Sequence, residues 1–190
     1  MQILFATRNK NKISEARAIL PGHTLLTLDD LSINHEVVED AGSFHGNAEK
    51  KAREYAALSG IPTFADDSGL CIDFLSGEPG VESANYLGNT SYLERMSHIL
   101  DRLANAGDRS AQFICQIVTV FPDGSQIDFL GRFCGQVAHK IAGNGGFGYD
   151  PIFFLPEYNC TVAELDISIK NKLSHRARAL TALAEALRKL

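Results

Sequence analysis

The sequence lacks the features of a membrane, disulfide-bonded or zinc protein. No apolar run approaches the length of a membrane span, and we expect MQILFATRNKNK to form a strand and a polar turn rather than a signal-peptide core. The four cysteines form no Cys-x-x-Cys pair, and the six histidines lack the spacing of metal ligands. We therefore expect buried, reduced thiols in a cytoplasmic protein, no membrane association and no zinc site.

Positive charge is also scarce, and two common sequence motifs of nucleotide-binding and hydrolytic enzymes are missing. The 18 Lys and Arg residues are outnumbered by 23 Asp and Glu residues, for a net charge of −5, which argues against sequence-independent binding of nucleic acid. The chain has neither the phosphate loop GxxxxGK[ST] nor the nucleophile elbow GxSxG. Ser68 is therefore a poor candidate for a catalytic nucleophile.

What is present is the composition of a globular protein, with 45% hydrophobic residues in 190 and no visible repeat or linker. We expect a single domain over residues 1–190, with two lobes. Apolar residues at helical spacing predict helices, and apolar runs bounded by turn residues predict strands. Signals for hairpins and for helical crossovers are interleaved, which predicts an α/β fold with a mixed sheet. The helices are expected at 12–20, 44–58, 92–107 and 173–190, and the strands at 2–8, 23–31, 62–75, 111–121 and 125–138.

The polar turn TRNKNK, residues 7–12, is the first candidate site. It lies where a strand passes into a helix, and such a junction offers backbone N–H groups and the positive end of the helix dipole to an anion. Arg8, Lys10 and Lys12 add three cations. An anion site and a plain solvated basic turn are both consistent with this pattern.

The adjacent acids Asp66 and Asp67 form the second candidate site. They follow an apolar run and precede Ser68-Gly69, which we interpret as a turn. Successive side chains of a strand point to opposite faces, so we expect one aspartate to cap the turn and its neighbour to face a cleft. Glu39 supplies another carboxylate, and a few oxygen ligands shared with substrate phosphates suit Mg²⁺.

Two further segments could bind a nucleotide. The glycine-rich stretch GNGGFGYDP, residues 143–151, contains Phe147, whose ring could stack on a base, and Tyr149, which we interpret as a core residue. KNKLSHRAR, residues 170–178, begins the last helix, with Ser174 as its expected N-cap. Cations in a first helical turn oppose the dipole, so a bound anion or a keto group would compensate them.

These motifs, taken in order, resemble those of the inosine triphosphate pyrophosphatase family, the XTP/dITP diphosphatases. The resemblance extends over essentially the whole chain. It rests on five stretches: Thr7-x-Asn9-x-x-Lys12, Phe44-x-x-Asn47-Ala48-x-x-Lys51-Ala52, Ala65-Asp66-Asp67-Ser68-Gly69-Leu70, Gly145-Gly146-Phe147-Gly148-Tyr149-Asp150-Pro151 and Ser174-His175-Arg176.

The resemblance implies a fold, an activity and roles for individual residues. The expected fold is a curved mixed β-sheet flanked by helices, with two lobes around a deep nucleotide-binding cleft. The expected activity is Mg²⁺-dependent hydrolysis of ITP, dITP and XTP to the monophosphate and pyrophosphate by a cytoplasmic homodimer. Asp67 matches the proton acceptor and metal ligand, Glu39 a second metal-associated acid, and Lys12 a catalytic cation. The residues that match substrate-binding positions are Thr7, Arg8, Asn9, Lys10, Asn11, Lys12, Lys51, Ser68, Phe147, Gly148, Tyr149, Asp150, Lys170, His175 and Arg176.

Two alternatives remain open on the sequence alone. A general nucleotide or sugar phosphatase could use the same metal and lysine chemistry, but it would release orthophosphate first. A non-catalytic nucleotide sensor would bind without forming product.

Overall fold

The chain is described by a computed structural model over residues 1–189, and it divides into two compact units. Unit 1 combines Met1–Asp67, Cys115–Gly131 and the segment that begins at His175, and unit 2 combines Ser68–Ile114 with Arg132–Ser174. Neither unit is one continuous stretch of chain. The nucleotide cleft implied by the resemblance stays a prediction.

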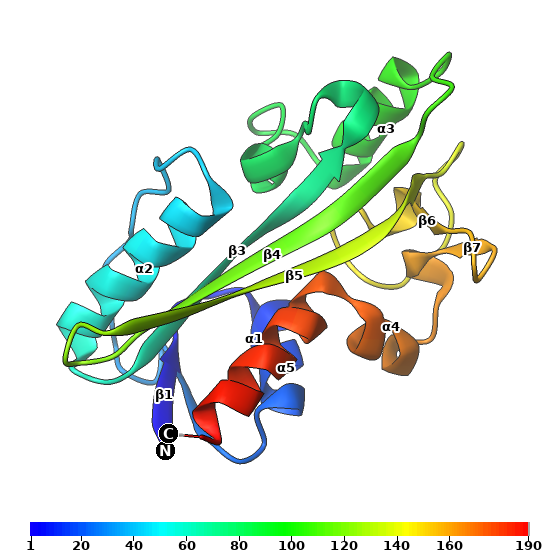
Figure 1. The fold of residues 1–190 in the computed structure, drawn as a ribbon. Coiled ribbons are helices and arrows are strands. Elements are labelled where there is room, and N and C mark those ends of the chain that lie inside the picture. The colour runs from blue at the N-terminus through cyan, green and yellow to red at the C-terminus, as the bar shows by residue number, and fades with distance from the viewer. Residues whose placement is uncertain (190) are drawn as a thin grey trace. The chain divides into compact units, whose positions relative to one another are not determined.

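Residues 1–189 form five α-helices and seven β-strands, whose order along the chain is coloured in Figure 1. The helices are α1 (Lys10–Ile19), α2 (Phe44–Ser59), α3 (Tyr92–Arg102), α4 (Ile167–Leu173) and α5 (His175–Leu187). The strands are β1 (Gln2–Phe5), β2 (Thr24–Thr27), β3 (Thr63–Ile72), β4 (Ser110–Val120), β5 (Gln126–Val137), β6 (Phe153–Leu155) and β7 (Cys160–Thr161). None of the helices within 1–189 is long and apolar enough to cross a membrane.

The strands form one mixed sheet, in the order β2-β1-β3-β4-β5-β6-β7. β1 pairs in parallel with β2 and β3, whereas β5-β6 and β6-β7 are antiparallel pairs. β3, β4 and β5 are the long neighbouring strands of Figure 1, and each passes from one unit into the other. The predicted α/β fold with a mixed sheet flanked by helices is confirmed.

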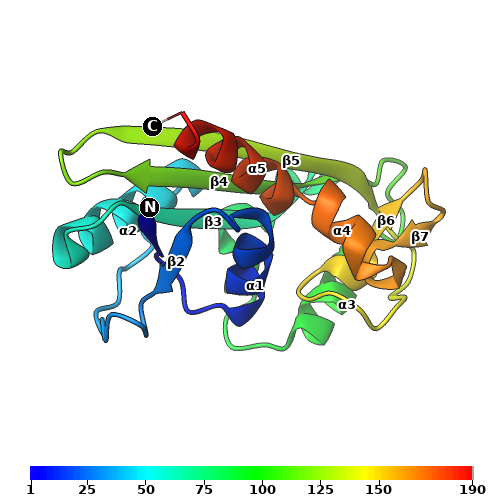
Figure 2. The same cartoon turned by 90° about the horizontal axis from the view of Figure 1, so that it is seen from below.

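Unit 1 has an apolar layer on each face of its part of the sheet. On one face Phe64 of β3 packs in a buried cluster with α1 and with Leu180 and Leu183 of α5, and Figure 2 views the unit from this side. On the other face Ala65 packs with Ala48 and Ala52 of α2. Neighbouring residues of β3 therefore serve opposite layers, as the alternation of a strand requires.

The ends of these helices follow local sequence signals. The Asn9 side chain caps α1, and the Ser43 side chain caps α2 by accepting from Gly46 N–H. Gly60 ends α2 in the left-handed conformation, with φ 69°, which glycine adopts without a steric penalty. The predicted boundaries of α2 are thus confirmed to within one residue.

Unit 2 has its own core, in which α3 packs against the aromatic residues of the sheet. Met96, Ile99 and Leu103 are buried with Phe113 and Phe153. The prediction extended this helix to Gly107, but α3 ends at Arg102, and Leu93 in its first turn is 60% exposed. The buried face of α3 includes Met96 and Ile99.

Other predictions from the sequence were also wrong in part. Cys134 is exposed, and only Cys115 is fully buried among the four thiols, all of which are free. The last predicted helix is two helices, because Ser174 is extended, with φ −61° and ψ 154°, between α4 and α5. Leu173 therefore belongs to α4, whereas Ala177, Leu180, Ala184 and Leu187 form the predicted buried face of α5.

Candidate active site

The junction between β1 and α1 forms an ordered, basic turn in unit 1. Thr7 Oγ1 accepts from Asn9 N–H at 3.2 Å, and Asn9 Oδ1 accepts from the N–H groups of Asn11 and Lys12 at 3.0 and 3.3 Å. The first turn of α1 contains no acid. Lys10 is exposed and the Lys12 ammonium is partly exposed, so the turn offers two cations beside the positive end of a helix.

Asp66 and Asp67 do not flank a turn, because β3 continues from Thr63 to Ile72 without interruption. Ser68 and Gly69 are ordinary residues of this strand. The predicted turn, and with it the turn-capping role of one aspartate, is wrong. The prediction that the two acids point to opposite faces is confirmed, since they have different partners on different elements.

Asp66 lies on the face of β3 that carries α1 and α5, inside a cluster of charges. Its Oδ1 accepts from Lys12 Nζ at 2.9 Å, and its Oδ2 accepts from Arg176 Nε at 2.9 Å. Arg176 Nη1 also donates to Glu15 Oε2 of α1 at 2.7 Å. The Cys115 thiol donates to Asp66 Oδ2 at 3.8 Å. The cluster thus joins α1, β3, β4 and α5.

A close approach of α5 to the sheet brings Arg176 to this position. Gly131 of β5 has no side chain, and a Cβ there would lie only 1.9 Å from the carbonyl oxygen of His175. Arg176 is 2% exposed and is one of the largest fully buried side chains. A buried arginine requires compensating acids, which Asp66 and Glu15 provide.

Asp67 lies on the opposite face of β3, next to α2. Its Oδ2 accepts from Asn47 Nδ2 at 2.9 Å. Lys51, one turn further along α2, donates to the Asp66 carbonyl oxygen at 2.8 Å and to Glu39 Oε2 at 2.9 Å. Asn47 and Lys51 share one helix face because they are four residues apart, so α2 brings an amide and an ammonium to the acids of β3.

The pKa values of the two neighbouring acids, Asp66 and Asp67, are shifted in opposite directions. Burial favours the neutral form of Asp66, but the charges of Lys12, Arg176 and Lys51 together hold its pKa far below the ordinary value. Burial raises the pKa of Asp67, and the charge of Lys51 and the Asn47 hydrogen bond only partly oppose this effect. The Glu39 carboxylate raises the pKa of Asp67 further. Such a divergence is typical of functional sites.

The donor set around Asp67 fits a magnesium ion. The cluster of Lys12, Lys51 and Arg176 contains three cations, and four carboxylates surround them: Glu15, Glu39, Asp66 and Asp67. Mg²⁺ uses one or two carboxylates together with substrate phosphates, and Asp67 and Glu39 are two carboxylates of this cluster. Residues 1–189 contain no group of three or more His, Cys, Asp or Glu side chains arranged to hold a metal by themselves.

The glycine-rich segment of unit 2 is held by a buried ion pair. Lys170 Nζ donates to Asp150 Oδ2 at 2.6 Å, and the same oxygen accepts from Phe147 N–H at 2.7 Å. Lys170 Nζ also lies 4.4 Å from the centre of the half-buried Phe147 ring. At Gly146, φ is +71° and a Cβ would lie 2.1 Å from Asp150 Oδ2. Only glycine fits there without disturbing the ion pair.

Tyr149 is a core residue, as predicted. It is 3% exposed, its hydroxyl donates to the Ser83 carbonyl oxygen at 2.9 Å, and its ring meets the edge of Tyr92. Burial raises the pKa of Tyr149, so it remains a neutral phenol. The ring of its neighbour Phe147 is half-buried and lies against Lys170.

The predicted site residues therefore fall into two groups. In unit 1 the structure brings Asp67, Glu39, Lys12, Lys51 and Arg176 into one cluster beside the α1 turn. In unit 2 it brings Phe147, Asp150 and Lys170 together. Arg8 is directed elsewhere, since it donates to the Ile33 carbonyl oxygen at 2.6 Å and lies near Asp29. His175 is buried at the start of α5, and Ser68 is half-buried in β3.

Reasoning from the sequence missed Glu15, Asn47 and Cys115 as members of the unit 1 cluster. Two of them have a local signal, because Glu15 is three residues from Lys12 on α1 and Asn47 is four residues from Lys51 on α2. Cys115 has no such signal. It comes from another strand, and burial raises its pKa so that it stays a thiol.

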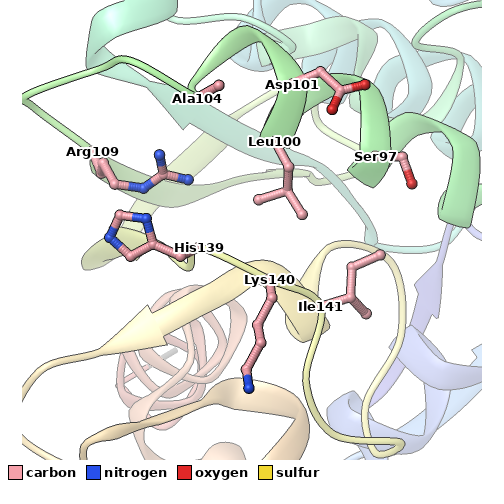
Figure 3. Close-up of a pocket in the computed structure, with 8 residues that line it drawn as sticks. All are labelled: Ser97, Leu100, Asp101, Ala104, Arg109, His139, Lys140 and Ile141. Atoms are coloured by element: carbon pink, nitrogen blue, oxygen red, sulfur yellow. The ribbon is translucent and has the colours of Figure 1, made fainter.

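A pocket of about 480 Å³ in unit 2 contains none of the predicted residues. Figure 3 shows Leu100 of α3 and Ile141 pointing toward its centre, with Arg109 beside His139. Arg109 donates to the carbonyl oxygens of Leu103, Val137 and Ala138. This arginine therefore ties the end of α3 to the end of β5.

Comparison with known proteins agrees with the motifs and the geometry. A sequence profile described as the Ham1 family matches residues 3–186. The chain is 44% identical to the dITP/XTP pyrophosphatase of Geobacter sulfurreducens over 98% of its own length and 96% of that protein. It is 41% identical to the dITP/XTP pyrophosphatase of Photorhabdus laumondii, with 98% of each chain covered.

Two solved structures have the same fold. A HAM1 protein from Coxiella burnetii superposes with a TM-score of 0.94 at 36% identity, covering 100% of both chains. The Ham1 protein of Staphylococcus aureus gives 0.92 at 36% identity, covering 100% of this chain and 99% of that one. The resemblance inferred from the five motifs is thereby confirmed. The chain belongs to the Ham1 family.

Proposed function

We propose that this protein hydrolyses the non-canonical purine nucleoside triphosphates dITP, XTP and ITP to their monophosphates and pyrophosphate, with Mg²⁺ as cofactor. The observation that carries the proposal is the unit 1 cluster. It combines a buried carboxylate of raised pKa, a second acid and two lysines beside a basic helix start. The relatives that share its whole length are named dITP/XTP pyrophosphatases.

The phosphate chain of the substrate is assigned to the α1 turn. Thr7, Asn9, Lys10 and Lys12 present hydroxyl, amide and ammonium groups at the positive end of α1. Fixed cations and dipoles at the site of charge development are often the largest contribution to catalysis. Asn11 completes the predicted substrate-binding turn, whereas Arg8, which was also predicted to bind substrate, is directed toward Ile33 and Asp29.

Asp67 is assigned the proton transfer. A carboxylate whose pKa is raised toward the working pH is a better general base than an ordinary aspartate, and Asn47 fixes its orientation. Asp67 would take the proton of the water that attacks phosphorus. Asp67 and Glu39 would hold Mg²⁺, which when bound neutralises phosphate charge and favours release of pyrophosphate. Lys51 holds Glu39 beside β3.

Selection of the base is assigned to Phe147, Gly148, Tyr149, Asp150 and Lys170 of unit 2, and to His175, Arg176 and Ser68. Hypoxanthine and xanthine carry a 6-keto acceptor where adenine carries a 6-amino donor. A side chain that donates to the keto oxygen therefore faces adenine donor to donor, and an unpaired buried donor costs about 1–3 kcal/mol. Dimerisation and a cytoplasmic location are further parts of this proposal.

The deciding experiment is a panel of nucleoside triphosphates with Mg²⁺, monitored separately for pyrophosphate and orthophosphate. We expect dITP, XTP and ITP to release pyrophosphate, and ATP and GTP to react far more slowly. Asp67→Asn is the matched control, because it keeps the shape of the side chain and should lose most turnover. Orthophosphate as the first product would indicate a general phosphatase, and binding without product would indicate a nucleotide sensor.

A further inference from the structure

Four charged side chains of unit 1 form a continuous series that ends at the phosphate-binding turn. Glu15 Oε2 accepts from Arg176 Nη1 at 2.7 Å, and Arg176 Nε donates to Asp66 Oδ2 at 2.9 Å. The other oxygen of the same carboxylate, Asp66 Oδ1, accepts from Lys12 Nζ at 2.9 Å. The series joins residues 110 and 161 positions apart in the chain.

Exposure decreases from one end of this series to its middle. The side chains of Asp66 and Arg176 are 1% and 2% exposed, that of Glu15 is 12% exposed, and that of Lys12 is 16% exposed. Only the two ends therefore reach toward solvent. A substrate at the α1 turn can meet the Lys12 ammonium, whereas Asp66 can act on it only through that ammonium.

A lysine is a poor phosphate ligand unless its position is fixed. Its long stem has many rotamers, and ordering it on binding reduces affinity. The carboxylate of Asp66 removes this freedom in advance, and it can do so only if the carboxylate is itself held in place. Arg176 holds it, since the guanidinium donates to the second oxygen of Asp66.

We propose that Asp66, Arg176 and Glu15 are positioning residues that fix Lys12 Nζ for the phosphate chain of the substrate. This inference rests on the proposed function for its ligand. It gives Asp66 a role that differs from that of its neighbour Asp67, and it gives Arg176 a role in phosphate binding in addition to the base recognition predicted for it.

A ligand without a base separates these two roles of Arg176. Inorganic tripolyphosphate carries the same phosphate chain as the nucleotide but offers nothing for a base-reading residue to contact. We therefore choose calorimetric titration with tripolyphosphate and Mg²⁺ as the measurement. The variants are Glu15→Gln, Lys12→Met and the double variant, because Glu15 lies furthest from the ligand and Gln keeps its size.

We expect Glu15→Gln to weaken tripolyphosphate binding about threefold to tenfold when Lys12 is present, and to have no further effect in the Lys12→Met protein. Glu15→Asp keeps the charge and should restore part of the affinity. Glu54→Gln is the control, because it removes a carboxylate of the same unit that pairs with exposed His35. It should leave the affinity unchanged.

Equal weakening by Glu15→Gln in both backgrounds, or none in either, would overturn the inference. If Glu15→Gln fails to fold, Glu15→Asp provides the same comparison, with a smaller expected loss that again must vanish with Lys12→Met. Absence of tripolyphosphate binding by the unaltered protein would contradict the role of Lys12 and therefore the inference. Binding without pyrophosphate release from dITP or XTP would contradict only the proposed function.

Discussion

Replacing the two adjacent aspartates one at a time should have different effects on stability: one substitution should destabilise the protein strongly, and the other should not destabilise it. Asp66→Asn removes the negative charge that Lys12 and Arg176 share in the interior, and both hydrogen bonds to these cations lose their ionic partner. Asp67→Asn removes a charge that the surroundings disfavour, while the new amide oxygen can still accept from Asn47. The two variants differ by one position and have the same chemistry.

The magnitude follows from the buried partners of Asp66. Removing one member of a buried ion pair costs about 3–5 kcal/mol because the remaining charge stays buried. For a chain of this length each kcal/mol shifts the unfolding midpoint by about 2–4 °C, so Asp66→Asn should lower it by about 10 °C at pH 7. Asp67→Asn should leave the midpoint unchanged or raise it.

The two pKa shifts predict how the contribution of each aspartate to stability changes with pH. The pKa of Asp66 is lowered in the folded state, so its stabilising contribution is present above its unfolded pKa near 3.9 and is lost as pH falls toward the folded value. The pKa of Asp67 is raised, so ionisation of Asp67 costs stability as pH rises above about 3.9, fully so once pH exceeds the folded pKa.

Calorimetric unfolding of the three proteins between about pH 2 and pH 8 tests both signs. The deficit of Asp66→Asn should be nearly constant above about pH 5 and should shrink as pH falls below about 4. Any advantage of Asp67→Asn should grow as pH rises above about 4. Equal destabilisation by the two substitutions at pH 7 would refute the opposite pKa shifts of Asp66 and Asp67.

The remaining predictions concern activity and unit 2. Removing divalent cations with a chelator should abolish turnover, and added Mg²⁺ should restore it; activity that survives chelation would exclude the proposed cofactor. Gly146→Ala places a Cβ against Asp150 and should destabilise the protein in thermal unfolding, by more than Gly124→Ala, which has a positive φ but open space around it. Lys170→Met should cost about 3–5 kcal/mol because Asp150 remains buried, whereas Lys172→Met removes an exposed lysine and should cost little.

Much of the fold could be predicted because its signals are local. The apolar spacing over residues 44–58 predicted α2, and the apolar runs at 111–121 and 125–138 predicted β4 and β5. The turn at Ser68-Gly69 was predicted from residue type and is wrong. The strand β3 continues through both residues, so its place in the sheet outweighs their local preference for a turn.

The candidate site was only partly predictable, because its contacts depend on tertiary packing as well as on local signals. Lys12, Lys51 and Asp67 could be found from motifs, but their partners could not be assigned. Lys12 binds Asp66 rather than Asp67, because the alternation of β3 turns these acids to different helices. The pairing of Arg176 with Asp66 depends on tertiary packing across 110 residues, about which spacing in the sequence gives no information.

The long sequence separation of the Arg176 contacts has a consequence for synthesis on the ribosome. The residues Glu15, Lys12 and Asp66 emerge early, but the arginine that balances the acids belongs to the last helix. Until it emerges, Asp66 and Glu15 lack a cation without which they are costly to desolvate. Nascent chains should therefore keep this part of unit 1 hydrated and loosely packed until Arg176 has left the ribosome. Products truncated before residue 176 should be preferred substrates for proteases and chaperones.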